Sequence, residues 1–298
     1  MTKLYQKSEI TFAILWIVAY VVLSSYADQL SLSIGIVKSV TAVLQIVMSL
    51  ILFFWIRSNN LSEKYGFCKP IIPARQFLYY LPLVIIASTA FWGGFGLQYG
   101  FPDTLMYVIS MCCVGFLEEV IFRGLLFRAM EKDSLKTAIL VSSLTFGLGH
   151  IVNLFNGSGR DPASSVIQVI FAVLVGFVLV LIFYYGKSLV PCIIFHSANN
   201  ALKVFEADGS FSPQIEMVMN LVAIFVVLGG YVFYLVKVFP EKAEQSKTEG
   251  ENDLWGSLST GVGYSTVGDK LPQRYIFPRG IFFTWKKTSL SVSGISPR

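Results

Sequence analysis

Residues 104–127, TLMYVISMCCVGFLEEVIFRGLLF, form an apolar run that is long enough to cross a membrane but carries three charged side chains. About 20 helical residues, each rising about 1.5 Å, span the ~30 Å of hydrocarbon in a bilayer. The three charges are Glu118, Glu119 and Arg123. Insertion scales put an ionisable group within a membrane at about 2.5–3.5 kcal/mol, so such groups indicate function. The stretch therefore predicts a transmembrane helix that contributes to a polar site.

The composition of the whole chain agrees with a membrane protein. Of its 298 residues, 54% are hydrophobic and only 14% are charged, whereas a soluble domain has about 25% charged residues. The mean hydropathy is +0.65. The net charge of +5 does not indicate nucleic acid as a partner here, because the basic residues lie between apolar runs, where they act as topology signals. The lipid bilayer is therefore an expected partner.

Eight apolar runs predict an all-α, polytopic transmembrane helical bundle of about eight spans with a polar C-terminal tail. The runs are 10–26, 34–56, 77–97, 104–127, 137–154, 165–185, 189–204 and 217–239. Residues 1–240 are expected to form one transmembrane helical domain with its motif core at 105–205. Residues 241–298 are rich in Lys, Glu, Ser, Thr and Gly and predict a flexible cytoplasmic tail. Gly93, Gly94, Gly96 and Gly176 are interpreted as helix-packing glycines.

The distribution of Lys and Arg predicts the orientation. With the N-terminus inside, the inside segments hold twelve basic residues: Lys3, Lys7, Arg57, Lys64, Lys69, Arg75, Arg128, Lys132, Lys136, Lys187, Lys237 and Lys242. The outside segments hold three: Lys38, Arg160 and Lys203. We therefore expect an integral, multi-pass protein of a bacterial cell membrane with both termini cytoplasmic. An alternative reading of the first run is a signal peptide cleaved near Ala27, which would leave seven spans.

Further polar residues within apolar runs extend the predicted site. The chain has two histidines, and both His150 and His196 lie in apolar runs. Glu119 and Arg123 are four residues apart and share a helix face, so they can pair. Glu118 is rotated by about 100° from Glu119 and can face a different neighbour. Asn200 follows His196 by four residues and shares its face.

These residue types suit peptide-bond hydrolysis, so a peptide or membrane-protein substrate is the second expected partner. Glu118, free of the Arg123 pairing, would act as general base on a water molecule that His150 orients. His196 and Asn200 would stabilise the oxyanion, and Glu119 would be the supporting member. A second possibility is one divalent metal, such as Zn²⁺, held by Glu118, His150 and His196, although no HExxH helix is present. A purely structural reading, with buried histidines and a Glu–Arg packing pair, also stays open.

Three motifs resemble those of the CAAX-protease and bacteriocin-processing (Abi) family of intramembrane proteases. The stretch 118–126, EEVIFRGLL, resembles the EExxxRG motif of that family; 146–150, FGLGH, resembles its FxxxH motif; and 196–200, HSANN, resembles its HxxxN motif. The resemblance covers about residues 105–205. It implies an eight-helix membrane fold and an endopeptidase of the glutamate or metalloprotease type. It also implies that Glu118 and His150 activate water, while His196 and Asn200 hold the oxyanion.

Two other functions remain as alternatives. Relatives of this type include prenyl-protein proteases and bacteriocin immunity proteins, so a non-catalytic immunity or scaffold protein of the same family is possible. Intramembrane Glu, His and Arg residues also form proton relays, as in a proton-coupled transporter. The spacing of the residues does not identify a substrate, and a CAAX substrate is not favoured over other membrane-associated peptides.

Overall fold

The structure is a computed structural model that describes residues 1–151, 162–207 and 213–240. These residues form helices, and in these ranges the sole strand-like pairing is an isolated bridge between Phe95 and Glu206. The all-α prediction is confirmed for this part of the chain. The predicted tail at 241–298 and its boundary lie outside the described residues.

The helices follow one another closely along the chain. The first half contains α1 (Thr2–Lys7), α2 (Glu9–Ile34), α3 (Ser39–Ser58), η1 (Ala74–Tyr80), α4 (Leu81–Ser88), η2 (Thr89–Phe91), α5 (Phe101–Glu118), η3 (Glu119–Phe127), α6 (Arg128–Met130) and α7 (Leu135–Gly149). The second half contains α8 (Pro162–Gly186), α9 (Val190–Ala201), η5 (Leu202–Phe205), α10 (Pro213–Val222), η6 (Ala223–Leu228), α11 (Gly229–Phe233) and η7 (Tyr234–Val238).

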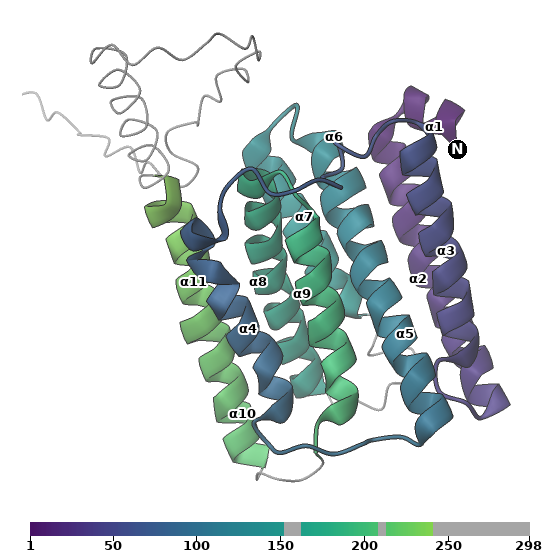
Figure 1. Cartoon of the computed structure of the whole chain (residues 1–298), viewed down its shortest axis with the longest axis vertical. Helices are drawn as coiled ribbons and strands as arrows, with labels where there is room; N and C mark the ends of the chain where they lie inside the picture. The colour runs from purple at the N-terminus through teal and green to yellow at the C-terminus, as the bar shows by residue number, and fades with distance from the viewer. Residues whose placement is uncertain (152–161, 208–212, 241–298) are drawn as a thin grey trace, which may run out of the picture. The chain divides into compact units, whose positions relative to one another are not determined.

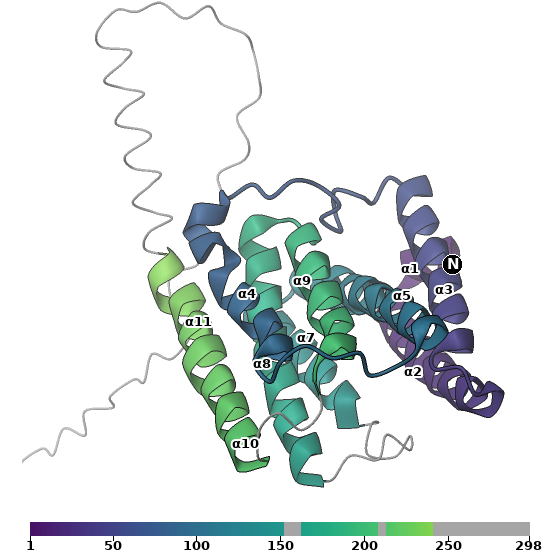
Figure 2. The same ribbon diagram turned by 60° about the horizontal axis from the view of Figure 1, so that its bottom comes forward.

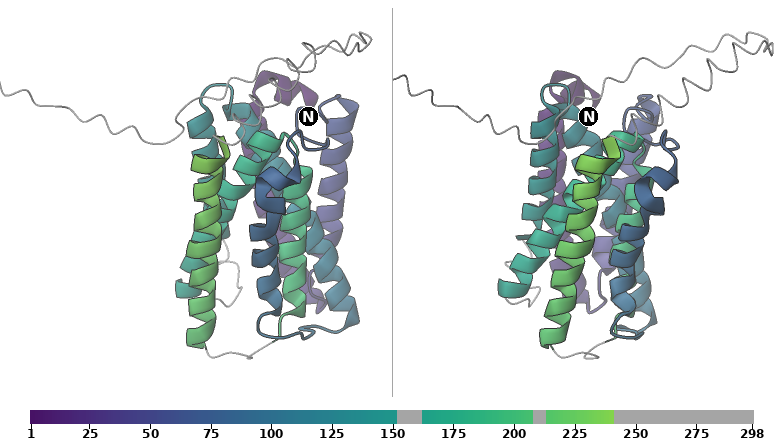
Figure 3. Two further views of the ribbon diagram at one scale, coloured as in Figure 1. Left: turned by 60° about the vertical axis from the view of Figure 1, so that its left-hand side comes forward. Right: turned by 90° about the vertical axis from the view of Figure 1, so that its left-hand side faces the viewer.

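Within the unit 1–243 the long helices lie side by side, and their connections gather at the two ends of the bundle (Figures 1 and 3). α9 lies between α4 and α5 and contacts both (Figure 2). Local sequence fixes where helices begin and end. The Ser8 side chain accepts a hydrogen bond from Thr11 N at the start of α2, and Gly35, with φ +82°, ends that helix.

Six described helices are long and apolar enough to cross a membrane. They are Glu9–Ile34, Ser39–Ser58, Ala74–Phe91, Phe101–Met130, Ser165–Gly186 and Val218–Val238. Many of their large apolar side chains are exposed, which fits a lipid-facing surface and an integral, multi-pass protein. Of the eight predicted spans, the two that this criterion does not include correspond to α7, with 15 residues, and α9, with 12. The count of about eight therefore stays a prediction.

The third predicted span, 77–97, differs most from the structure. Three consecutive residues, Leu78, Tyr79 and Tyr80, have φ between +52° and +57°, so the candidate span Ala74–Phe91 is kinked there and its regular α-helix begins at α4. It ends at Phe91. Gly94 has φ +108°, and 93–96 belong to a connection, so the interpretation of these glycines as helix-packing residues was wrong. Gly176 does pack closely, since a Cβ there would lie 3.1 Å from the Ser143 backbone.

One end of the bundle, which we call the basic end, gathers Lys64, Arg128, Lys132 and Lys187. Lys64 Nζ and Lys132 Nζ lie 2.8 and 3.0 Å from Glu9 Oε1, so the helix ends are tied together. Burial lowers the pKa of Lys64, but hydrogen bonds to Glu9 and Tyr5 outweigh it and raise that pKa above its ordinary value. These four residues, which are predicted to lie on one side of the membrane, therefore lie at one end of the protein, while the orientation in the membrane stays a prediction.

Candidate active site

The carboxylates lie where α5 continues directly into η3. Glu118 is the last residue of α5 and Glu119 the first of η3, a π-helix. π-helical turns are rare and frequently mark functional sites. The side chains of Glu119 and Arg123 are both 0% exposed. The sequence motif thus places two charges in the interior of the bundle.

Glu119 and Arg123 form the predicted pair, with 3.0 Å between Glu119 Oε1 and Arg123 NH1. The Arg123 N–H groups are not aligned on any acceptor among the described residues, so the contact is an ion pair without a hydrogen bond. The guanidinium also lies over the Phe146 ring, 4.1 Å from its centroid. This cation–π contact gives the buried charge a second favourable partner.

A glycine lets α9 approach the carboxylates. A Cβ on Gly115 of α5 would lie 2.5 Å from Ser197 N, which is far inside contact distance. Ser197 Oγ donates to Cys112 O at 3.1 Å and fixes the register of the two helices. His196, the residue before Ser197, is therefore carried directly against Glu118 and Glu119.

His196 lies between the two carboxylates. Its Nδ1 donates to Glu119 Oε1 at 2.8 Å, and its Nε2 lies 3.4 Å from Glu118 Oε2. Arg123 is the ion-pair partner of Glu119, so the buried carboxylate of Glu119 has a cationic neighbour as well as the imidazole. Buried charges in proteins are paired in this way.

Tyr20 is a further member of this cluster that the sequence reasoning missed. Its hydroxyl donates to Glu118 Oε1 at 2.7 Å, from α2 and across a sequence separation of 98 residues. A tyrosine in an apolar run has no signal that distinguishes it from a packing residue. The pairing also bears on the signal-peptide alternative, because cleavage near Ala27 would remove a residue that contacts Glu118.

His150 and Asn200 lie at the edge of the cluster. His150 Nδ1 donates to Phe146 O at 3.1 Å, which leaves Nε2 as the acceptor nitrogen. The Phe146 ring contacts both histidine rings, with centroids 5.3 Å from His150 and 5.5 Å from His196. Asn200 Oδ1 accepts from Asn199 Nδ2 at 3.4 Å. Among the described residues no polar contact joins either of them to Glu118.

The metal possibility can be compared with this arrangement. In the described part of the chain, no three His, Cys, Asp or Glu side chains are grouped so that they could hold a metal ion. Glu118 and His196 are in contact, whereas His150 is connected to His196 only through the Phe146 ring. Metal binding by Glu118, His150 and His196 therefore stays a prediction.

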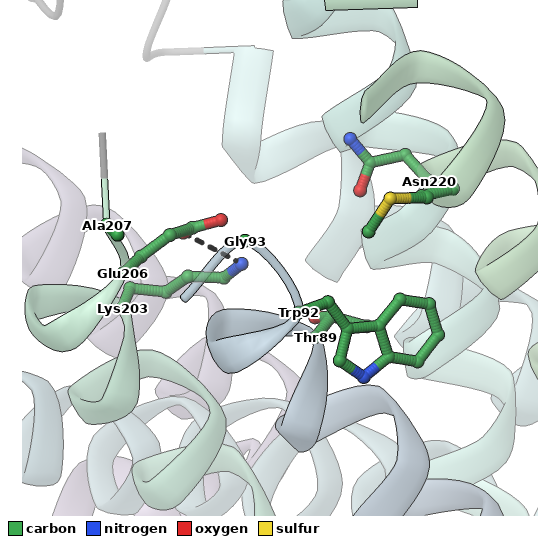
Figure 4. Close-up of a pocket in the computed structure, with 8 residues that line it drawn as sticks. Thr89, Trp92, Gly93, Lys203, Glu206, Ala207 and Asn220 are labelled. Carbon is green, nitrogen blue, oxygen red and sulfur yellow. Dashed lines mark hydrogen bonds and ion pairs between the residues drawn. The ribbon is translucent and has the colours of Figure 1, made fainter. Parts of the chain in front are cut away.

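A separate open pocket, with an empty volume of about 480 Å³, contains none of the predicted site residues (Figure 4). Its lining includes Thr89, Trp92, Lys203, Glu206, Met219 and Asn220. Lys203 and Glu206 form an ion pair of 3.2 Å in which both side chains are about 40% exposed. An exposed pair of this kind contributes little stability. The pocket therefore differs from the buried cluster of Glu118, Glu119 and His196.

Comparison with known proteins identifies one relationship. Residues 98–202 match the family model described as type II CAAX prenyl endopeptidase Rce1-like. The segment includes all six predicted site residues but not Tyr20. No curated protein and no solved structure matches the chain. The resemblance first indicated by the three motifs is therefore confirmed, and it supports a function of the CAAX-protease kind.

Proposed function

From the match of residues 98–202 to the Rce1-like family, we propose that this chain is an intramembrane endopeptidase of the glutamate type. The observation that carries the proposal is the position of His196 between Glu118 and Glu119 inside the bundle. A buried carboxylate next to a histidine is the arrangement that general acid–base catalysis needs, and burial makes each electrostatic interaction stronger than in water.

In the proposed mechanism, His196 donates to the substrate and Glu118 activates the water. Glu119 accepts from Nδ1 and stabilises His196 as an imidazolium, whose Nε2–H turns from Glu118 to the carbonyl oxygen of the substrate. Glu118 Oε2 is then free to take a proton from water as the hydroxide attacks the carbonyl carbon. The same proton passes to the leaving amine when the C–N bond breaks. His196 and Asn200 donate to the oxyanion.

His150 would orient the attacking water. Its Nδ1–H is engaged by Phe146 O, so Nε2 is the nitrogen available to accept from the water. Asn200 would have to exchange its Asn199 contact for the oxyanion, which makes this residue the one that changes most on substrate binding. The substrate we propose is a membrane-associated or lipid-facing peptide or protein segment, because the cluster lies within helices that have lipid-facing surfaces.

The proposal is tested by cleavage of a quenched peptide library and of membrane-embedded peptides by the purified full chain in detergent. Wild type is compared with Glu118→Gln, His150→Ala and Glu63→Gln, in which the exposed Glu63 serves as a matched control. We expect cleavage by wild type and by Glu63→Gln, and a loss of about 100-fold or more in the two site variants. A chelator should leave the wild-type rate unchanged.

Each other outcome has a definite meaning. Loss of activity with the chelator, restored by Zn²⁺, would contradict the glutamate mechanism and favour a metalloprotease. A folded wild type that cleaves no substrate would favour the immunity or scaffold alternative, in which the cluster serves binding. Proton flux in proteoliposomes that depends on Glu118 would instead favour a transporter.

A further inference from the structure

We propose that Tyr20 is a positioning residue of the active site, whose hydroxyl holds one oxygen of Glu118 so that the other faces His196 and the reacting water. This inference rests on the proposed function and deepens it. It extends the site to α2, a helix that lies outside the matched segment 98–202.

The two oxygens of Glu118 have different surroundings. Oε1 accepts from the Tyr20 hydroxyl at 2.7 Å, a normal length for such a bond. Oε2 is buried, has no hydrogen-bond partner in the described residues and lies 3.4 Å from His196 Nε2. An unsatisfied buried carboxylate oxygen needs an explanation, and a reacting water is a suitable one. Tyr20 therefore determines which oxygen is left for that water.

The packing around Tyr20 requires its ring but not its hydroxyl. Tyr20 is 8% exposed, on the face of α2 that meets η3, whereas Val18 and Val22 on the same helix are 52% and 58% exposed. A phenylalanine would fill the same space. A buried hydroxyl is unfavourable without a partner, and here the partner is the catalytic carboxylate. Packing thus accounts for an aromatic ring at position 20, and the hydrogen bond to Glu118 accounts for its hydroxyl group.

The expected effect is on the chemical step and not on substrate binding. Without the hydroxyl, the Glu118 carboxylate can rotate away from the water, and a misplacement of about 1 Å can lower a rate by roughly 100-fold. Because the Tyr20 hydroxyl donates to Glu118, whose proposed role is to activate water and not to bind substrate, KM should change little. We expect Tyr20→Phe to lower kcat by about 10- to 100-fold with KM within about twofold of wild type.

The experiment compares Tyr20→Phe with Tyr26→Phe, since Tyr26 lies on the same helix and is 65% exposed. Tyr26→Phe should retain wild-type kcat and KM. Combining Tyr20→Phe with Glu118→Gln should cause no further loss, because both changes act on one catalytic group. A kcat of Tyr20→Phe equal to wild type, in an enzyme that Glu118→Gln inactivates, would overturn the inference and leave the proposed function intact.

A second measurement does not need activity. A hydrophobic carbodiimide modifies carboxyl groups within membranes, and the rate at Glu118 can be followed by mass spectrometry. We expect faster modification in Tyr20→Phe than in wild type and Tyr26→Phe, because Oε1 loses its hydrogen bond. Equal rates in all three proteins would contradict the positioning role even if no substrate is found, and an inactive wild type with the expected rates would contradict only the proposed function.

Discussion

At the scale of single residues, the site depends on how its charges are distributed. Arg123 forms an ion pair with Glu119, and Glu118 lies against His196, so each carboxylate has its own neighbouring base. The motif spacing predicts the first of these pairs, and the structure contains it. The second pair joins residues that are distant in sequence, and it places an imidazole beside the proposed general base.

Arg123→Gln should lower the free energy of unfolding by about 3–5 kcal/mol, because it leaves Glu119 charged and buried without a partner. The measurement is thermal or denaturant unfolding in detergent. Arg57→Gln, at an exposed position near the end of α3, is the control and should leave stability within about 0.5 kcal/mol of wild type. An Arg123→Gln protein as stable as wild type would mean that Glu119 is neutralised in another way.

At the scale of helices, glycines decide which elements can meet. Gly115 lets α5 and α9 come together, and Gly147 does the same for α7 and α8, where a Cβ would lie 2.9 Å from Val173 N. Small residues are the common means of close helix approach in membranes. The position of His196 on α9 thus depends on Gly115, which lies three residues before Glu118 on α5.

Gly115→Ala should push α9 away from α5, lower activity by more than 10-fold and destabilise the protein by about 1–3 kcal/mol. Gly230→Ala is the matched control, since no atom lies within 4 Å of the Cβ it would add. That variant should gain up to ~1 kcal/mol from its better helix propensity. The activity and the free energy of unfolding of both variants are measured in the same detergent. Equal values for Gly115→Ala and Gly230→Ala would show that the close approach of α5 and α9 is not needed for activity or stability.

Helix existence was predictable from sequence, but several helix ends and long-range contacts were not. The runs of apolar residues correspond to the long helices because burial and lipid exposure follow directly from side-chain polarity. The left-handed residues at 78–80 carry no glycine signal. The two residues before them are held by distant side chains, since the hydroxyls of Tyr231 and Tyr234 donate to Phe77 O and Gln76 O at 2.8 and 2.7 Å. The Tyr20–Glu118 contact could not be predicted either, because it joins residues that are 98 positions apart in the sequence.

At the scale of the whole membrane unit, the basic end is the feature that bears on orientation. The bundle alternates direction, so the segments 59–73 and 92–100 leave it at opposite ends (Figure 1). Lys64, Arg128, Lys132 and Lys187 all belong to the end that includes 59–73. Positively charged segments stay in the cytoplasm more readily than they cross.

We therefore expect the basic end to face the cytoplasm. In a cysteine-free background, a membrane-impermeant maleimide applied to intact cells should label Gln98→Cys and not Asn60→Cys, and cell lysis should make Asn60→Cys reactive. Both native positions are exposed. Labelling of Asn60→Cys alone in intact cells would reverse the orientation and place the end with the basic residues outside.

The Glu119–Arg123 pair lies within one continuous helix, Phe101–Met130, and this has a consequence for biosynthesis. A chain emerges from the ribosome N-terminal end first, so this helix reaches the translocon before α9 and His196 have been made. Arg123 accompanies Glu119 from the start, and Tyr20 has already been inserted to receive Glu118. The nascent helix can thus enter lipid with its charges largely compensated, and the histidine completes the site last.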